Sequence, residues 1–311
     1  MRGFVGGVNV VIAGLVVAAA LAAGGGLLAG MVPSFDVLTH LAPVYGVVGL
    51  LGLVWAVLAG RGPVAAAALL AAVASAALIL PEVRRDTGPA APPDAAGQVK
   101  VIQINALRTN ADVRRVADWL IAQRPDFVMI AEARPDLRDA LRAAGWKTAG
   151  AGGAQMIFTR ERYLVMHRPA RRAGALTFVN ATYATASGPV EALTTHVGWP
   201  THRTVGAELA RLEEVVGQLP RERMILAGDF NAAGWSREMR RLDRSLGLIR
   251  RDRAAATWPA EVLGMPWPLP FAPIDHIYAG PGWATVKVER GPWVGSDHYP
   301  LVVTLAPVAP P

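Results

Sequence analysis

Three long apolar runs occupy the first part of the chain. Val8 to Gly30 is nearly continuously apolar, Val37 to Gly60 forms a second run, and the alanine-rich stretch from Pro63 to Leu80 forms a third. Each is close to the ~20 residues that an α-helix needs to cross a bilayer. The pattern predicts three transmembrane helices near residues 8–30, 37–60 and 63–80, within an anchor that covers residues 1–81.

The first run has an alternative interpretation as a cleaved signal peptide, because the alanines near Ala20 to Ala23 resemble a cleavage region. It is long for a signal peptide, and further spans follow it directly, so we favour the anchor. Arg2 and Arg61 would lie on one side of the membrane and Arg84 and Arg85 on the other, which nearly balances the positive charge. Because the first helix usually decides orientation, we expect the large domain outside the cytoplasm.

After the anchor, the apolar runs become short and alternate with polar segments. Residues 82–97 are rich in Pro and Ala, which predicts a linker without regular structure. A single domain is expected over residues 98–306, followed by a tail of residues 307–311. Helical periodicity within the domain predicts helices over Val113–Gln123, Pro135–Ala144, Arg203–Leu219 and Ser236–Leu246.

Short apolar runs in the same domain predict its strands. Ala154–Thr159 and Tyr163–His167 are expected to form a meander, and Leu176–Ala184 and Val190–Thr195 a hairpin turned by residues 186–189. Further strands are expected over Val99–Ile104, Asp126–Ala131 and Met224–Asn231, with two late ones beginning at Pro273 and Ser296. Meanders mixed with strand–helix units favour an α/β (α+β) fold of two packed sheets with helices outside over a purely parallel sheet.

Charge and cysteine content limit the kinds of binding partner and metal site that the chain can have. The net charge is +7, and residues 1–96 contribute none of it because their four basic and four acidic residues cancel. A basic domain favours anionic partners such as phosphate esters, nucleic acid or lipid headgroups. The chain has no cysteine, which excludes disulfides and thiolate metal sites.

Polar side chains stand where the expected strands end. In the stretch after Ala227, Asp229 and Asn231 would project to one face while Phe230 points the other way, although an Asx turn is the plain alternative. Taken singly, each such residue has an ordinary explanation, and Asp275 with His276 could be a local hydrogen-bonded pair. Taken together, they suit a phosphate or metal site, and the set is Asn105, Glu132, His196, Asp229, Asn231, Asp275, Asp297 and His298.

These segments resemble the endonuclease/exonuclease/phosphatase superfamily of metal-dependent phosphoesterases. The resemblance covers nearly all of residues 98–306 and implies a four-layer α/β sandwich of two mixed sheets flanked by helices, with the site at one rim. The membrane-anchored bacterial members are the most similar, which implies a multi-pass protein of the bacterial inner membrane. In chain order, the matching segments are the Asn105 strand, Ala131-Glu132, Thr195-His196, Gly228-Asp229-Phe230-Asn231, Ile274-Asp275-His276 and Ser296-Asp297-His298.

The matched positions imply a role for each residue. Glu132 and Asn105 would hold Mg²⁺, with Mn²⁺ as a substitute, and Asp297 would lie close to the metal. His298 would be the general base or the electrostatic partner of the phosphate, oriented by Asp275. Asp229 would position or deprotonate the attacking water. The phosphoryl group would receive hydrogen bonds from Asn231 and His196.

Two departures from the family pattern bear on these roles. Some nuclease members carry a second acid two residues after the first asparagine, and this chain has Leu107 there, which predicts leaner metal binding. The tryptophan-flanked signatures of inositol polyphosphate phosphatases are missing around Asp229 and Asp275, which weakens an inositide substrate.

The predicted function is therefore a membrane-tethered, Mg²⁺-dependent phosphoesterase acting on a phosphodiester or phosphomonoester. The alternative is a catalytically silent scaffold domain at the membrane. A nucleic-acid substrate is suggested by an arginine-rich stretch that could equally be a solvated helix face: Arg237, Arg240, Arg241, Arg244, Arg250, Arg251 and Arg253. A lipid substrate is suggested by aromatics that could equally be packing residues: Trp258, Trp267, Phe271 and Trp293.

Overall fold

The computed structural model describes residues 2–150, 154–167, 176–185, 188–202 and 205–308. Parts of the expected 186–189 turn, the start of the expected helix at Arg203 and most of the expected tail lie outside these residues. The chain divides into two compact units. A helical unit contains Met1–Arg85 and Ala233–Arg240, and a sheet unit contains Asp86–Ala232 and Arg241–Pro311.

The helical unit contains candidate membrane spans. Two helices are long and apolar enough to cross a bilayer, over Gly7–Gly30 and Gly62–Val83. The second expected span, over residues 37–60, is instead a pair of helical segments, Pro33–Thr39 and Ala42–Leu58, bent by 61°. Pro43 lies in the first turn after the bend, where a proline can begin a helix but cannot continue one. The unit's elements are α1 (Arg2–Leu27), η1 (Leu28–Gly30), η2 (Pro33–Phe35), α2 (Asp36–Thr39), α3 (Ala42–Leu58) and α4 (Gly62–Val83).

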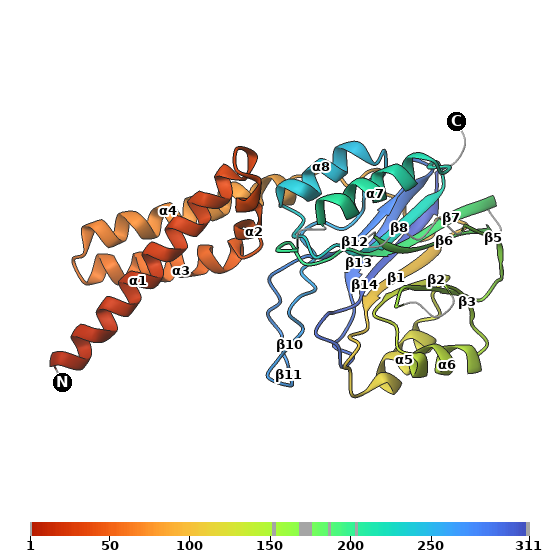
Figure 1. Cartoon of the computed structure of the whole chain (residues 1–311), viewed down its shortest axis with the longest axis horizontal. Coiled ribbons are helices and arrows are strands. Elements are labelled where there is room, and N and C mark those ends of the chain that lie inside the picture. The colour runs from red at the N-terminus through yellow and green to blue at the C-terminus, as the bar shows by residue number, and fades with distance from the viewer. Residues whose placement is uncertain (1, 151–153, 168–175, 186–187, 203–204, 309–311) are drawn as a thin grey trace. The chain divides into compact units, whose positions relative to one another are not determined.

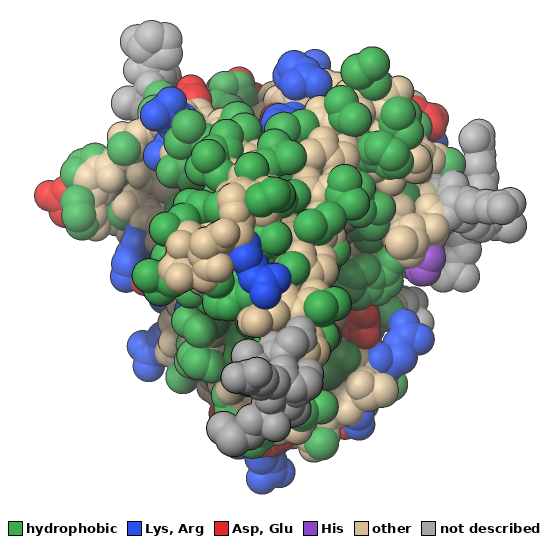
Figure 2. Space-filling view, turned by 90° about the vertical axis from the view of Figure 1, so that its left-hand side faces the viewer, with side chains coloured by type: hydrophobic (Ala, Val, Ile, Leu, Met, Phe, Trp, Pro, Cys, Tyr) green, Lys and Arg blue, Asp and Glu red, His purple; other side chains and the backbone are tan. Residues whose placement is uncertain are grey.

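Small residues let these helices approach one another closely. A Cβ atom on Gly49 of α3 would lie 2.7 Å from the backbone nitrogen of Ala72 in α4, and one on Gly52 would lie 2.4 Å from Val16 of α1. Close backbone approach at small residues is the usual packing of helices in a bilayer, where apolar side chains gain nothing by leaving lipid. In Figure 2, many hydrophobic side chains lie on the face turned to the viewer, interspersed with backbone and few charged side chains.

A buried carboxylate joins distant parts of the sequence within the helical unit. Asp36 accepts hydrogen bonds from the backbone N–H groups of Arg237 (2.7 Å) and Glu238 (3.1 Å), at the start of α8 (Arg237–Ser245). It thereby satisfies donors that the first helical turn leaves unpaired, and its charge lies at the positive end of the helix dipole. The indole of Trp235 also donates to the Thr39 carbonyl at 2.7 Å. The segment that follows the Asp229–Asn231 motif is therefore part of the helical unit.

Two mixed six-stranded sheets form the sheet unit (Figure 1). The first has the order β13-β14-β1-β2-β4-β3, and the second has the order β5-β6-β7-β8-β12-β9. The strands of the first sheet are β1 (Val99–Asn105), β2 (Phe127–Ala131), β3 (Lys147–Ala149), β4 (Met156–Thr159), β13 (Trp283–Arg290) and β14 (Leu301–Pro307). Those of the second are β5 (Tyr163–His167), β6 (Thr177–Thr185), β7 (Gly188–His196), β8 (Met224–Asp229), β9 (Ile249–Arg250) and β12 (Asp275–Ala279).

Helices cover the outer faces of the two sheets. Figure 1 shows α5 (Val113–Gln123) and α6 (Pro135–Ala143) on one side of the sheets and α7 (Val205–Gly217) on the other. The inner core lies between the sheets and is built from alternate residues of their strands, such as Val101, Ile225 and Ile277. The intervening residues of β1, Ile102 and Ile104, pack instead with α5 and α6. This arrangement confirms the expected four-layer α/β sandwich.

Strand partners differ from expectation in places. The expected meander of β4 and β5 is wrong, because β4 pairs with β2 and β3 while β5 pairs with β6 in the other sheet. Apolar periodicity identifies a strand but carries no information about its neighbour. Ser296 begins a loop, and the last strand starts only at Leu301. The strand β13 and the small hairpin of β10 (Glu261–Val262) and β11 (Met265–Pro266) were not expected.

The packing of β7 on β8 predicts that Gly228 cannot carry a side chain. A Cβ atom there would lie 2.3 Å from the Thr195 carbonyl oxygen, which belongs to the backbone and cannot move away cheaply. Gly228→Ala should lower the free energy of unfolding by about 1–3 kcal/mol, measured by urea unfolding of the full chain in detergent. Gly206→Ala in α7 is the matched control, because nothing lies within 4 Å of its added Cβ. A Gly228→Ala protein as stable as this control would contradict the packing.

Candidate functional site

The site lies at the ends of strands β8 and β1, on the faces of these strands that point into the core between the sheets. In β8, Ile225 and Ala227 belong to the inner core, and the next residue on that face is Asp229. In β1, Val99 and Val101 belong to the core and are followed on the same face by polar residues, Gln103 and Asn105. Each row therefore changes from apolar to polar at the same rim of the sandwich. The carboxylate and amide groups there are buried because they face the opposite sheet.

Strand register places the second sheet's polar residues side by side. Asp229 lies opposite His196 of parallel β7 and opposite Asp275 of antiparallel β12. Directly paired residues point to the same face of a sheet, so all three side chains converge. The first sheet meets this row through Asn105, whose Nδ2 donates to Asp229 Oδ2 at 3.0 Å.

A buried ion pair lies at the centre of the site. His298 Nδ1 is 2.8 Å from Asp275 Oδ2, which also accepts a hydrogen bond from Thr257 Oγ1 at 2.6 Å. Burial by itself lowers the pKa of His298, but the charges of Asp275 and Asp229 outweigh it and raise the pKa to about 10. Burial would raise the pKa of Asp275, yet the nearby His298 and the hydrogen bonds lower it overall. The pair is therefore an imidazolium held by a carboxylate.

Asp229 is the most heavily connected carboxylate. Its Oδ1 accepts the N–H of Asn231 at 2.8 Å, and its Oδ2 lies 3.5 Å from His196 Nε2 and 3.8 Å from His298 Nε2. Burial, helped by the neighbouring charge of Asp275, raises the pKa of Asp229 despite the two histidines. A carboxylate with a raised pKa accepts a proton more readily, which suits a general base.

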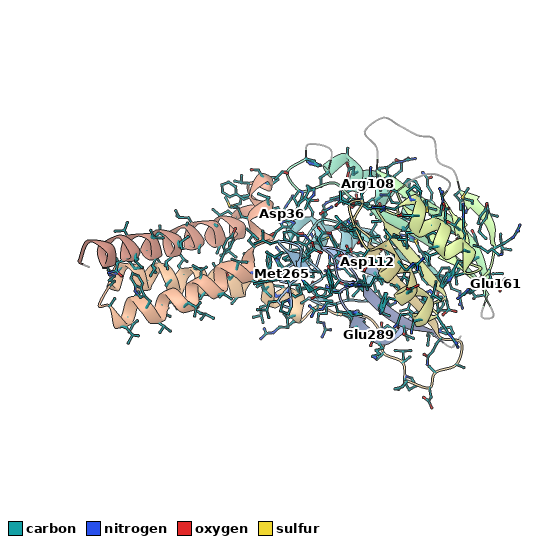
Figure 3. The ribbon with its side chains drawn as sticks, turned by 90° about the horizontal axis from the view of Figure 1, so that it is seen from below. Asp36, Arg108, Asp112, Glu161, Met265 and Glu289 are labelled. Carbon is teal, nitrogen blue, oxygen red and sulfur yellow. The ribbon has the colours of Figure 1, made fainter. Side chains whose placement is uncertain are left out.

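Glu132 is the more open carboxylate of the site. It follows β2 with a left-handed φ of 56°, and its Oε2 accepts the N–H of Arg108 at 3.0 Å. Its Oε1 accepts a hydrogen bond from Asn105 Nδ2 at 3.3 Å. Burial raises the pKa of Glu132, but these hydrogen bonds and the charge of His196 lower it overall, so the group is ionised. Figure 3 labels Arg108 in the loop after β1.

His196 and Asn231 form the remaining side of the site. Asn231 Nδ2 lies 3.2 Å from His196 Nε2 and donates to the Val197 carbonyl at 2.9 Å. Asn231 has a left-handed φ of 49°, so it follows the strand in an Asx turn closed by the Asp229 carboxylate. The motif therefore forms the Asx turn that was the plain alternative, and it also contributes its side chains to the site. Phe230 points away, as expected, and packs against His276 and Tyr278.

The structure joins seven of the eight sequence-predicted residues into one network. The hydrogen bonds and carboxylate–imidazole contacts of this network join Asn105, Glu132, His196, Asp229, Asn231, Asp275 and His298. The eighth residue, Asp297, directly precedes His298 in the sequence. Its carboxylate accepts a long hydrogen bond of 3.5 Å from Ser296 Oγ. Its charge also contributes to the raised pKa of His298. Its backbone carbonyl accepts the Ala260 N–H at 2.7 Å.

Two groups of side chains are candidates for a divalent cation, and the Glu132 position fits it better by its chemistry. Asp229, Asp275 and His298 offer donor atoms that all lie within 4.8 Å of one another. Asp275 already uses its oxygens for hydrogen bonds from His298, Thr257 and Gln103, so a metal there would displace protein donors. Glu132 is partly exposed, and its hard oxygens suit a hydrated Mg²⁺. Asn105 turns Nδ2 rather than its oxygen towards Glu132, so it orients the carboxylates in this arrangement.

Several site residues were missed from the sequence. Gln103 donates to Asp275 at 3.3 Å, and its position two residues before Asn105 in an otherwise apolar strand was an available signal. Thr257, which donates to Asp275 at 2.6 Å, was also missed. Ser296 Oγ donates to the Asn105 carbonyl at 2.7 Å and accepts the His298 N–H at 3.1 Å, which positions His298.

The alternative in which Asp275 and His276 form a local hydrogen-bonded pair does not hold. They lie on opposite faces of β12, so Asp275 meets His298 while His276 Nδ1 lies 2.7 Å from Asp252. His276 Nε2 lies 3.0 Å from the Ala232 carbonyl, just after the Asp229–Asn231 motif. His276 therefore contacts the backbone next to the Asp229–Asn231 motif from the face of β12 opposite Asp275.

Two of the seven arginines in the arginine-rich stretch, Arg250 and Arg251, are buried inside the protein, and a third is paired with a carboxylate. Arg250 is buried and pairs with Asp243 at 2.8 Å. Arg251 is also buried and donates to the carbonyl of Gly280 at 2.8 Å. Arg241 forms an ion pair with Glu213. Neither a continuous phosphate track nor a fully solvated helix face describes this stretch.

Comparison with known proteins agrees with this geometry. The model of the Endonuclease/Exonuclease/phosphatase family matches residues 97–298. An endonuclease/exonuclease/phosphatase from Beutenbergia cavernae is 18% identical, with a TM-score of 0.52, and the match covers 68% of this chain and 72% of that one. One from Bacteroides vulgatus is 18% identical, with a TM-score of 0.54 and coverage of 68% and 99%.

D. rerio TDP2, solved with a single-strand DNA product, is 16% identical, with a TM-score of 0.54 and coverage of 67% and 98%. Comparison with curated proteins gives no match. At these identities the likeness to solved structures establishes the fold alone.

Fold and site together define a two-sheet α/β sandwich with a rim of carboxylates and histidines, the type of protein in which phosphoesterases occur. Because the family model covers most of the chain, the chain belongs to the endonuclease/exonuclease/phosphatase family.

The buried Asp252–His276 pair predicts a stability that depends on acid pH. Burial would raise the pKa of Asp252, but the charge and hydrogen bond of His276 lower it to about 2 from the model-compound value of 3.8. The stabilisation is therefore present above about pH 4 and is lost as the pH falls towards 2. Asp252→Asn should lower the free energy of unfolding at neutral pH by about 2 kcal/mol, and this difference should shrink between pH 4 and pH 2.

Urea unfolding of the full chain in detergent measures this difference at each pH. Asp94→Asn is the matched control, because Asp94 is exposed. A difference between wild type and Asp252→Asn that stays constant down to pH 2 would contradict the ion pair.

Proposed function

We propose that the protein is a divalent-metal-dependent phosphoesterase that hydrolyses a phosphodiester or phosphomonoester by attack of water. The observation that carries the proposal is the continuous network in which Asp229 connects Asn105 and Glu132 on one side with His298 and Asp275 on the other. Family membership supports the same reaction class.

Glu132 is the residue we assign to the cation, with Mg²⁺ as the favoured ion and Mn²⁺ as a substitute. When bound, the ion would neutralise phosphate charge and stabilise the leaving oxygen. Asn105 holds the Glu132 and Asp229 carboxylates in place through its Nδ2. Asp297 is kept as a candidate outer contact of the ion.

Asp229 is assigned to position and deprotonate the attacking water. Its raised pKa follows from burial and suits this role. The hydrogen bonds from Asn231 N and Asn105 Nδ2 fix the direction of the carboxylate. Such fixed geometry is worth more than proximity alone, because no reorganisation is needed in the transition state.

His298 is assigned as a cationic partner of the phosphoryl group and not as a general base. Each of its ring nitrogens faces a carboxylate, Asp275 at 2.8 Å and Asp229 at 3.8 Å, which favours the charged form. His196 and Asn231 would donate hydrogen bonds to phosphoryl oxygens as negative charge develops there.

The membrane part of the proposal follows from the apolar helices. Two helices, with the bent pair as a further span, would hold the protein in a bacterial inner membrane. We propose the sheet unit on the non-cytoplasmic side, because the flanking arginines nearly balance and the first helix usually decides orientation. The substrate would be nucleic acid or a lipid headgroup.

A silent scaffold is the competing function, and a matched pair of variants separates the two. The full chain in detergent should hydrolyse bis-p-nitrophenyl phosphate with added Mg²⁺ and lose this activity with a chelator. Glu132→Gln and Asp229→Asn should each lower the rate by roughly 10²-fold or more, because each removes a charge that the transition state uses. Glu161→Gln removes an exposed carboxylate and should leave the rate unchanged.

Titration calorimetry with Mg²⁺ alone gives a readout that does not depend on turnover. Wild type should bind the ion more tightly than Glu132→Gln. Absence of both turnover and Mg²⁺ binding in a folded wild-type protein would favour the scaffold.

A further inference from the structure

The β10–β11 hairpin and the residues directly after it expose several large apolar side chains. Leu263 is 92% exposed, Leu269 is 69% exposed and Met265, labelled in Figure 3, is 64% exposed. Between Glu261 and Asp275 the sequence contains no charged residue. Singly exposed leucines are ordinary on protein surfaces, whereas a continuous charge-free group of them marks a contact surface.

The backbone of the tip makes this exposure harder to explain in water. Leu263 and Gly264 connect the paired residues Val262 and Met265, and their φ values are 54° and 76°. Such a turn normally takes Asn, Asp or Gly at its first position, because φ is positive there. Leu263 therefore occupies a strained conformation with its side chain in solvent. An apolar environment around the tip would offset both unfavourable contributions.

The hairpin is fastened to the candidate site at its base. Phe271 N donates to the Trp258 carbonyl at 3.0 Å, and the Ala260 N–H donates to the Asp297 carbonyl at 2.7 Å. Thr257, which precedes the hairpin, donates to the catalytic candidate Asp275 at 2.6 Å. Tyr299 Oη donates to the Trp267 carbonyl at 2.9 Å. The hairpin therefore stands beside His298 on a short, hydrogen-bonded base.

The chain itself indicates which apolar environment is available. Only Arg84 and Arg85 separate Val83, the last residue of α4, from Asp86, the first residue of the sheet unit. In the sequence, the sheet unit therefore directly follows a helix that is long and apolar enough to cross a bilayer. The exposed Arg290 lies at the base of the hairpin, with its guanidinium 4.5 Å from the Tyr299 ring centroid, and suits anionic headgroups.

We propose that the β10–β11 hairpin inserts its apolar tip into the bilayer interface and presents the site to phosphate esters of membrane lipids. The substrate part rests on the proposed phosphoesterase activity, whereas the insertion rests on the proposed membrane spans alone. Trp267 and the Leu and Met side chains supply the amphipathic and apolar groups that such interfaces favour.

Single-cysteine labelling tests the insertion directly. The chain has no cysteine, so Leu263→Cys or Met265→Cys provides one thiol for a nitrobenzoxadiazole label. The full chain in vesicles of phosphatidylcholine and phosphatidylglycerol should show blue-shifted emission that acyl-chain nitroxide lipids quench. Leu164→Cys on β5 is the matched control, because Leu164 is apolar and 61% exposed. Its label should remain aqueous, and aqueous emission at both hairpin positions would overturn the insertion.

Hydrolysis of the same vesicles tests the substrate class. The double variant Leu263→Ser with Leu269→Ser should release soluble lipid-derived product roughly tenfold more slowly than wild type, because two large apolar contacts are removed. Its hydrolysis of bis-p-nitrophenyl phosphate should be unchanged, as should both activities of Leu164→Ser.

The outcomes separate this inference from the proposed function. Hydrolysis of bis-p-nitrophenyl phosphate without release of lipid product would overturn the lipid substrate and leave the phosphoesterase function intact. Faster cleavage of single-stranded DNA than of vesicle lipid would also overturn the lipid substrate. Hydrolysis of none of these esters would overturn the proposed function and the lipid substrate together, while the label would still report insertion.

Discussion

The register of β8 between β7 and β12 is the constraint on which the site depends. It places Asp229 directly beside His196 and Asp275, and it also directs Ile225 and Ala227 into the core between the sheets. A slip of one residue would turn every side chain of β8 to the other face. The apolar residues that hold the register therefore also fix the position of the carboxylate.

Burial of several charges at one rim is possible because they compensate one another. His298 lies between Asp275 and Asp229, and neutral donors from Thr257, Gln103 and Asn105 complete the network. An unpaired charge in the same position would be strongly destabilising. On the opposite face of β12, Asp252 is likewise buried against a histidine, His276, whose other ring nitrogen contacts the Ala232 carbonyl. Site geometry and stability thus rest on shared residues.

The helical unit includes more than the candidate membrane spans. It includes Ala233–Arg240, the segment that follows the catalytic-candidate motif, and Asp36 caps the helix that begins there. The helix α8 begins in the helical unit and continues into the sheet unit, so its first residues are covalently connected to both units. The aromatic and apolar residues of the β10–β11 hairpin are a separate feature, and they connect the site to a lipid surface only in our proposal.

Local chemistry was sufficient to predict much of this protein. Apolar run length indicated the helices of the first unit, and periodicity placed α5 at its observed bounds. The order of polar strand ends indicated the family and seven residues that the structure joins. Partners remote in sequence could not be predicted in this way: the separation of β4 from β5, the Asp36 cap on α8, and the pairing of His276 with Asp252 instead of Asp275. Periodicity reports which face of an element is apolar, whereas neighbours are chosen by packing that involves the whole chain.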